Sequence, residues 1–241
     1  MRILITNDDG ISSPALPILA RWASKFGDVT VIAPKVEQSA KSQGIDIRNE
    51  IEVKRVDIGE DIIAYSVSST PADCTRFGVL GLGEQYDLII SGINRGYNLG
   101  HDISYSGTVA AIMEGSRFGI NGLAISTDFE TLIPASAYLD EVYRFITDND
   151  LYNYNNLYNV NIPPVSSGIA ITRQGGMFFK DAFAHRGGDM YIQTGEPITE
   201  HNGDLSVDID AIRSGYISVT PLTAEKTNIP VFEKLKKSTQ H

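Results

Sequence analysis

Short apolar runs that alternate with stretches of helical spacing constrain the fold of this chain more than any other feature of its sequence. The runs are continuous rather than alternating, as in parallel strands that helices cover on both faces. This pattern predicts an α/β fold built on a doubly wound, mainly parallel sheet. The runs are Ile3–Ile5, Val29–Ala33, Leu88–Ile90, Leu123–Ile125 and Ile169–Ile171.

Residues at helical spacing fill the segments between these runs, and capping residues mark most of the starts. The Asn- and Tyr-rich segment Tyr152–Pro164 is expected to be a connector that leads into the last core strand. The four predicted helices begin at Ser13–Pro14 or at Pro17, at Thr70–Pro71 with Asp73 in the first turn, near Ser106, and at Leu132, the last one ending at Thr147.

The texture of the sequence changes after about residue 172, where extended segments replace the alternating pattern. Turn residues at Arg186–Asp189 predict a β-hairpin. The segment DLSVDIDAIRSGYISVTPL predicts two more extended pieces that turn at Ser214–Gly215. We therefore expect an α/β core over residues 1–172 and a β-rich C-terminal extension over residues 173–241, which together form a single structural unit.

Composition excludes several classes of protein. The one cysteine, Cys74, excludes an internal disulfide framework and a four-cysteine zinc site. A net charge of −10 gives no general attraction for nucleic acid or anionic lipid, and no apolar run is long enough to span a membrane. The N-terminus does not read as a signal peptide, so a cytoplasmic location is expected. An anionic substrate would need a local source of positive potential.

Two adjacent carboxylates, Asp8 and Asp9, follow directly after the first predicted strand. Ligands of an open parallel sheet bind beyond the carboxyl ends of its strands. Neighbouring carboxylates repel each other unless a cation lies between them, and oxygen ligands suit Mg²⁺, Mn²⁺ or Ca²⁺ rather than zinc. The motif therefore indicates a site for a hard divalent ion. An Asp-Gly turn with a solvated neighbour is the alternative interpretation.

A glycine-rich segment and a helix start follow the third apolar run. The segment SGINRGYNLG places Asn94 and Asn98 among glycines that let main-chain amides approach an anion. Residues Ser106–Thr108 then open a helix, whose free amides favour a phosphate group. Each feature alone also fits a surface turn or an ordinary N-cap. Their closeness in the sequence favours a phosphate site.

The segment APKVEQSAKSQG follows the second predicted strand and offers hydroxyl and ammonium groups. Ser39 and Ser42 supply the hydroxyls, and Lys35 and Lys41 supply local positive charge; a solvated loop is the alternative. His101 lies near the glycine-rich segment and is a candidate general acid, or else a surface histidine.

These motifs form one ordered set between residue 3 and about residue 222: ILITNDDG, APKVEQSA, STPADC, SGINRGYNLGHDISYSGTVAAIMEG, LYNVNIP and GYISVTPL. The set resembles the survival protein E (SurE) family of metal-dependent nucleotidases. The NDDG start and the SGIN…YSGTV block carry the resemblance most specifically. It implies a Rossmann-like fold with an extended C-terminal part, and a homodimer or homotetramer in which C-terminal arms are exchanged.

The resemblance also implies one divalent ion per subunit, most simply Mg²⁺ or Mn²⁺, and hydrolysis of 5′- or 3′-phosphates of nucleoside monophosphates. Asp8 and Asp9 would be catalytic as well as metal-binding, one of them receiving the proton of the attacking water. The chain departs from the family at Ser69, where glycine usually precedes Thr-Pro-Ala-Asp-Cys. By position, the implied metal ligands are Asp8, Asp9, Ser39 and Asn94, and the implied phosphate contacts are Asn98, Ser106, Gly107 and Thr108.

Three hypotheses for the function follow, and in each the partner is a nucleotide rather than a nucleic acid polymer or a membrane. The favoured one is hydrolysis of nucleoside monophosphates by a metal-activated water. A second is a phosphatase in which Asp8 or Asp9 attacks phosphorus, although its usual signature is Asp-x-Asp with a later lysine. A third is a non-catalytic nucleotide-binding module built on the same loop and helix start.

Overall fold

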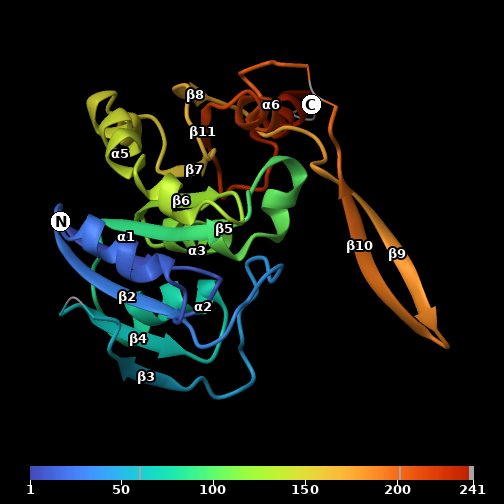
Figure 1. The fold of residues 1–241 in the computed structure, drawn as a ribbon. Helices are drawn as coiled ribbons and strands as arrows, with labels where there is room; N and C mark the ends of the chain where they lie inside the picture. The colour runs from blue at the N-terminus through green and yellow to red at the C-terminus, as the bar shows by residue number, and fades with distance from the viewer. Residues whose placement is uncertain (60, 201, 239–241) are drawn as a thin grey trace.

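A nine-stranded sheet forms the centre of the molecule, in the order β3-β4-β2-β1-β5-β6-β7-β11-β8 (Figure 1). The structure is a computed structural model that describes residues 1–59, 61–200 and 202–238. The six neighbouring strands β4, β2, β1, β5, β6 and β7 run parallel to one another. Strand β3 is antiparallel to β4, and β11 is antiparallel to β7. The predicted doubly wound, mainly parallel α/β fold is thereby confirmed.

The secondary-structure elements have the following bounds. The strands are β1 Arg2–Thr6, β2 Asp28–Pro34, β3 Val53–Val56, β4 Ile63–Val67, β5 Leu88–Arg95, β6 Asn121–Thr127, β7 Leu157–Ile162, β8 Ile169–Ile171, β9 Phe179–Gly187, β10 Met190–Pro197 and β11 Ile217–Pro221. The helices are α1 Ala15–Ala23, α2 Pro71–Arg76, η1 Phe77–Gly81, η2 Gly100–Tyr105, α3 Gly107–Ser116, α4 Leu132–Ser136, α5 Leu139–Asp148, η3 Leu151–Asn153, α6 Asp208–Arg213 and α7 Ile229–Ser238.

Both faces of the central sheet are covered, as the continuous apolar runs predict. Ile3 and Ile5 pack into one core with residues of α1, α4 and α5. Leu4, between them in sequence, packs into a second core with residues of α2 and α3. Successive side chains of a strand point to opposite faces, so a strand buried on both faces has apolar residues at every position.

The predicted capping residues are found at the starts of α2 and α3. Thr70 Oγ1 accepts a hydrogen bond from the Asp73 amide, and Ser106 Oγ accepts one from the Val109 amide. Helix α1 begins at Ala15, so Pro17 lies in its first turn, where no intrahelical amide partner is lost. The predicted Leu132–Thr147 helix is divided into α4 and α5.

Two predictions for the second half of the chain are wrong. The supposed connector Tyr152–Pro164 contains β7, every residue of which is buried in the sheet between β6 and β11. Two extended pieces were expected on either side of a turn at Ser214–Gly215, but the piece before the turn contains helix α6. Its Ile209 and Ile212 are three residues apart and share one helical face, a spacing that a reading for alternation overlooks.

The C-terminal part combines a hairpin, two helices and one strand of the central sheet. The predicted hairpin is confirmed as β9 and β10, which extend away from the body of the molecule (Figure 1). Strand β11 lies inside the central sheet, between β7 and β8. Strands β3 and β4 and helix α7 lie where no element was predicted. Within the described part of the chain, no helix is both long and apolar enough to cross a membrane.

Candidate active site

Asp8 and Asp9 lie where β1 ends, beside the ends of β2 and β5. Asp8 is only 5% exposed, and its Oδ1 accepts a hydrogen bond of 2.6 Å from Thr108 Oγ1 at the start of α3. The Asn7 side chain folds back on the Gly10 main chain through two hydrogen bonds of 3.1 Å, which fixes the turn that carries both carboxylates. The acid pair and the helix start are therefore in direct contact.

Burial raises the pKa values of both carboxyl groups, and nearby negative charges add to the rise. Burial raises the pKa of Asp8, and the hydrogen bond from Thr108 lowers it by a smaller amount. Burial and the nearby Asp8 charge raise the pKa of Asp9 to about 6, and the main-chain amide of Arg95 opposes that rise. The buried Asp9 Oδ2 has no hydrogen-bond partner within the described residues. An unpartnered carboxylate oxygen beside a second acid is the arrangement that a bound cation stabilises.

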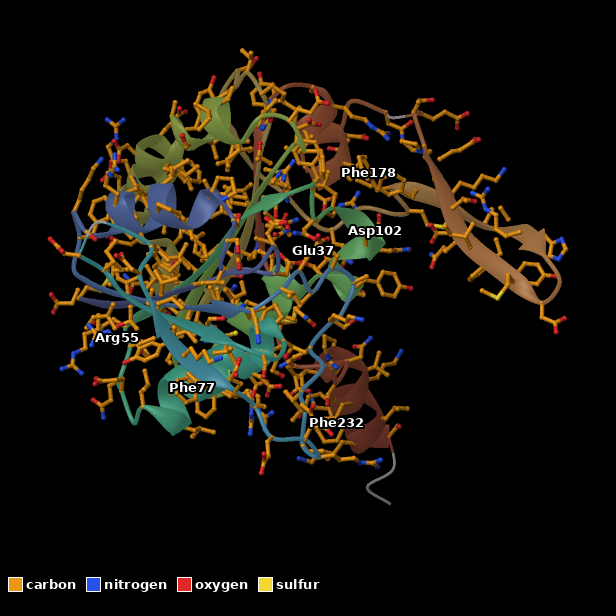
Figure 2. The ribbon with its side chains drawn as sticks, turned by 60° about the horizontal axis from the view of Figure 1, so that its bottom comes forward. Glu37, Arg55, Phe77, Asp102, Phe178 and Phe232 are labelled. Carbon is orange, nitrogen blue, oxygen red and sulfur yellow. The ribbon has the colours of Figure 1, made fainter. Side chains whose placement is uncertain are left out.

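The loop after β2 passes directly over the acid pair. The Gln38 amide donates to the Asp8 carbonyl at 2.7 Å, and Ser39, the next residue, is exposed. Ser39 Oγ donates to Glu37 Oε1 at 2.6 Å, which leaves its oxygen free to accept or to ligate. Glu37, drawn with its side chain in Figure 2, raises the pKa values of Asp8 and Asp9 by its charge. Glu37 was not among the predicted site residues.

Asn94 lies at the end of β5 rather than in a loop, because β5 continues to Arg95. Its Nδ2 donates to the Gly96 carbonyl at 2.7 Å, so its Oδ1 remains available to a cation. Gly92 permits this course of the strand: its φ is +138°, and a Cβ there would lie 2.3 Å from the Ile125 carbonyl oxygen. The main chain of Arg95 reaches the Asp9 carboxylate, which places Asn94 next to the acid pair.

The first turn of α3 provides donors that face the acid pair. Asp8 packs against this turn so closely that a Cβ on Gly107 would lie 2.9 Å from Asp8 Cβ. The amides of Val109 and Ala110 bond to Ser106, and the Thr108 amide bonds to the Asp8 carboxylate, whereas the Gly107 amide has no acceptor within the helix. The Gly107 amide, at the positive end of a ten-residue helix, suits a phosphate oxygen.

Asn98 is buried, and its Nδ2 donates to Ser126 Oγ at 2.7 Å. Ser126 is the strand partner of Asn94, so Asn98 is placed close to the end of β5. Its main chain is held by Asn159 and Asn161 of β7. Neither asparagine was predicted as a site residue, because their segment has the composition of a connector.

The remaining candidates make no described contact with the acid pair. His101 is exposed in η2, and its ring makes no described contact with Asp8 or Asp9. Ser42 bonds to the η2 main chain through its amide and its hydroxyl, at 3.0 Å each. Lys35 Nζ pairs with Glu52 at 2.9 Å. Cys74 is buried, and burial raises the pKa of its thiol.

The described oxygen donors fit a hard divalent cation. Asp8, Asp9, Ser39 and Asn94 offer carboxylate, hydroxyl and amide oxygens, and no described residue donates a hydrogen bond to Asp9 Oδ2 or Asn94 Oδ1. Mg²⁺, Mn²⁺ and Ca²⁺ prefer such ligands. Within the described residues, no group of three or more His, Cys, Asp or Glu forms a metal cluster, so a site here depends on the neutral oxygens as well.

Comparisons with known proteins agree with this arrangement. A family model described as survival protein SurE matches residues 3–181. The chain is 38% identical to a 5′-nucleotidase SurE of Thermosipho melanesiensis over 98% of its own length and 96% of the relative's, and 39% identical over the same shares to that of Thermosipho africanus. The crystal structure of a SurE protein from Aquifex aeolicus superposes with a TM-score of 0.80 at 31% identity and covers 99% of each chain. The chain belongs to the survival protein SurE family.

Proposed function

We propose that this chain is a metal-dependent nucleotidase that hydrolyses the phosphate monoester of nucleoside monophosphates. The observation that carries the proposal is the 2.6 Å hydrogen bond from Thr108 Oγ1 to Asp8 Oδ1. It joins an oxygen-rich cation site to the amides of a helix start, so a cation and a phosphate could be held side by side. The printed names of the relatives, 5′-nucleotidase SurE, support the same activity.

Asp8, Asp9, Ser39 and Asn94 are the residues proposed to hold one divalent ion, Mg²⁺ or Mn²⁺. When bound, such an ion supplies Lewis-acid polarisation of a phosphoryl oxygen and lowers the pKa of a coordinated water. Asp9, whose buried Oδ2 has no hydrogen-bond partner among the described residues, would accept a proton. The positive ion also offsets the repulsion between the acid pair and an anionic substrate.

Asn98 and the start of α3 are proposed to hold the phosphoryl group. The amide of Gly107 and the second N–H of Asn98 Nδ2 would donate to phosphate oxygens, and the Ser106 hydroxyl can donate while its oxygen caps the helix. Thr108, whose hydroxyl and amide both bond to Asp8, would lie beside these donors. Phosphoryl transfer depends mainly on positioning and charge stabilisation. These donors therefore suffice without a covalent nucleophile.

The residues proposed to hold the phosphoryl group form a phosphate cradle, and a cavity beside it has room for the rest of a nucleotide. It has a volume of about 500 Å³ and begins at Ser106. Ile103, Met113 and Leu222 supply apolar walls, and Arg173 supplies a positive charge. Small-molecule sites combine an apolar surface with a few polar groups in this range of volume.

The test of the proposed function is release of inorganic phosphate from 5′- and 3′-nucleoside monophosphates in the presence of Mg²⁺, Mn²⁺ or Ca²⁺. We expect release with at least one nucleotide and one metal ion, its fall to background on chelation, and its return when the ion is added in excess. Release that persists in excess chelator would contradict the role given to the metal. A nucleotide that binds but is not hydrolysed with any ion would identify a binding module.

We also propose a homodimer or homotetramer in which the C-terminal extension, from about residue 173, contacts other subunits. Hairpin β9–β10 is exposed almost throughout and carries the exposed side chains of Phe183 and Tyr191. Helix α7 has no buried residue and exposes Val231 and Phe232, the latter drawn in Figure 2. An isolated hairpin is marginally stable in water, which argues for a partner. A cytoplasmic location, with which the buried free thiol of Cys74 is compatible, is part of the proposal.

Light scattering tests the assembly. At micromolar concentration we expect at least twice the chain mass of 26.3 kDa. Phe183→Asp should lower the measured mass, because it places a charge on the apolar surface of the hairpin. Lys180→Ala, on the same strand, is the control and should leave the mass unchanged. A monomer at this concentration for the unmodified chain rules the assembly out.

A further inference from the structure

Strand β7 carries two asparagines at positions where a buried strand ordinarily has apolar residues. Asn159 and Asn161 are both 0% exposed, and their spacing of two residues places them on one face of the strand. A buried amide is costly unless its donors and acceptor are hydrogen bonded. Their contacts therefore indicate why polar side chains are retained there.

Both side chains bond to the main chain of one residue, Asn98. Asn161 Nδ2 donates to the Asn98 carbonyl at 2.9 Å, and Asn161 Oδ1 accepts from the Asn98 amide at 2.8 Å. Asn159 Nδ2 donates to the same carbonyl at 2.8 Å. Asn161 thus uses its whole amide group to hold a single peptide segment, much as a neighbouring strand would.

The same asparagine is tied to the metal side of the site through Ser126. Asn98 Nδ2 donates to Ser126 Oγ, and Ser126 is the strand partner of Asn161 on β7 and of Asn94 on β5. Asn94, Ser126 and Asn161 therefore form a row across three neighbouring strands, with Asn98 fixed to it by its main chain and its side chain. One N–H of the Asn98 amide group is left for a ligand.

We propose that Asn161 is a positioning residue, which holds Asn98 in the orientation that donates to the phosphoryl group of the substrate. This inference rests on the proposed function, because the phosphate contact of Asn98 belongs to it. Asn161 touches neither cation nor substrate. It acts by fixing the main chain of the residue that does.

A double-mutant cycle tests the proposal. We expect Asn161→Ala and Asn98→Ala each to lower kcat/KM for the best nucleoside monophosphate by about 10- to 100-fold, as misplacement by about 1 Å does. The double variant should be no slower than Asn98→Ala alone, because Asn161 acts only through Asn98. The inhibition constant of inorganic phosphate should rise in both single variants. Effects that multiply in the double variant, or an unchanged kcat/KM in Asn161→Ala, would overturn the proposal.

Asn155→Ala is the matched control. Asn155 precedes β7 at its opposite end, where Nδ2 donates to the carbonyls of Leu157 and Leu222. Its removal takes away a comparable pair of side-chain to main-chain hydrogen bonds, so it should lower stability while kcat/KM and the phosphate inhibition constant stay unchanged. An equal kinetic loss in Asn155→Ala would mean that β7 has only a structural role, and the proposal would fall.

Two further measurements decide the matter if Asn161→Ala does not fold or if the chain hydrolyses no nucleotide. Ser126→Ala removes only the hydrogen bond that anchors the Asn98 side chain. It should also weaken the binding of inorganic phosphate, measured by calorimetry with Mg²⁺ present. Hydrogen exchange of the Asn98 amide should be slow in the native chain, because that amide donates to Asn161. Unchanged phosphate binding in Ser126→Ala, or fast exchange in the native chain, contradicts the positioning role, whereas absent hydrolysis alone contradicts the proposed function.

Discussion

Replacement of Asp9 by asparagine is expected to lower turnover by at least ~10²-fold while it stabilises the metal-free protein. Loss of a main electrostatic group in an active site has an effect of this size. Asn keeps the shape of the side chain but removes the charge and the proton acceptor that the proposed mechanism needs. The measurement is phosphate release at saturating Mn²⁺. Turnover close to that of the native chain would contradict the role of Asp9.

The gain in stability follows from the raised pKa of Asp9. Folding raises this pKa from 3.8 to about 6, so the folded state binds the proton more tightly than the unfolded state. Stability is therefore lost as pH rises from about 4 to about 6, and the penalty is complete above that range. A shift of this size corresponds to at most ~3 kcal/mol, and partial exposure reduces the expected penalty to ~1 kcal/mol.

Thermal unfolding in excess chelator measures this gain. Asp9→Asn should unfold about 2–4 °C above the native chain at pH 7, and the difference should disappear near pH 4. Asp28→Asn is the matched control, since Asp28 is exposed at the start of β2 and makes no described side-chain contact. No stabilisation in Asp9→Asn, or the same gain in Asp28→Asn, would show that the acid pair is not strained in the absence of a cation.

Gly107→Ala is the second variant from which a large effect is expected, about 10²-fold in kcat/KM. The added Cβ would lie 2.9 Å from Asp8 Cβ, 3.1 Å from Asp8 Oδ2 and 3.2 Å from Pro71 Cγ. Since α2, Asp8 and α3 meet there, Asp8 or the helix start must shift, and the phosphate cradle moves relative to the cation site. Overpacking lowers the free energy of unfolding by ~1–3 kcal/mol. The lower conformational entropy of alanine in the unfolded chain offsets part of this loss.

Activity and stability must be measured together for this variant. The net loss of stability should leave the protein folded at 25 °C, so a kinetic defect reports on geometry rather than on unfolding. Gly176→Ala is the control, because a Cβ at that position meets no atom within 4 Å. Full activity in Gly107→Ala would mean that the contact between Asp8 and the start of α3 is not part of the active site.

The fold could be predicted largely because its central strands are buried on both faces. Ile3–Ile5 and Leu123–Ile125 are apolar at every position, and such runs have few other interpretations. Strand β7 escaped prediction because its buried positions include Asn159 and Asn161, whose hydrogen bonds to Asn98 are made by tertiary structure alone. Helix α6 was predicted as an extended segment because it has only six residues. In so short a segment, the alternation of apolar residues typical of a strand cannot be told from the spacing typical of a helix.

The candidate site could be predicted residue by residue but not as a network. Adjacent carboxylates and a capped helix start are local signals, and they predict Asp8 and Ser106 as site residues. Glu37 and Asn161 carry no such signal, because each becomes part of the site only when the β2 loop and β7 lie beside β1 and β5. Long-range contacts of this kind require the folded chain.

The most direct test of the central claim is the position of Mn²⁺ in crystals grown with inorganic phosphate, located by anomalous scattering. We predict a peak among the oxygens of Asp8, Asp9 and Asn94, with a phosphate oxygen at the amide of Gly107. A manganese ion bound elsewhere, or a phosphate away from the start of α3, would contradict the account.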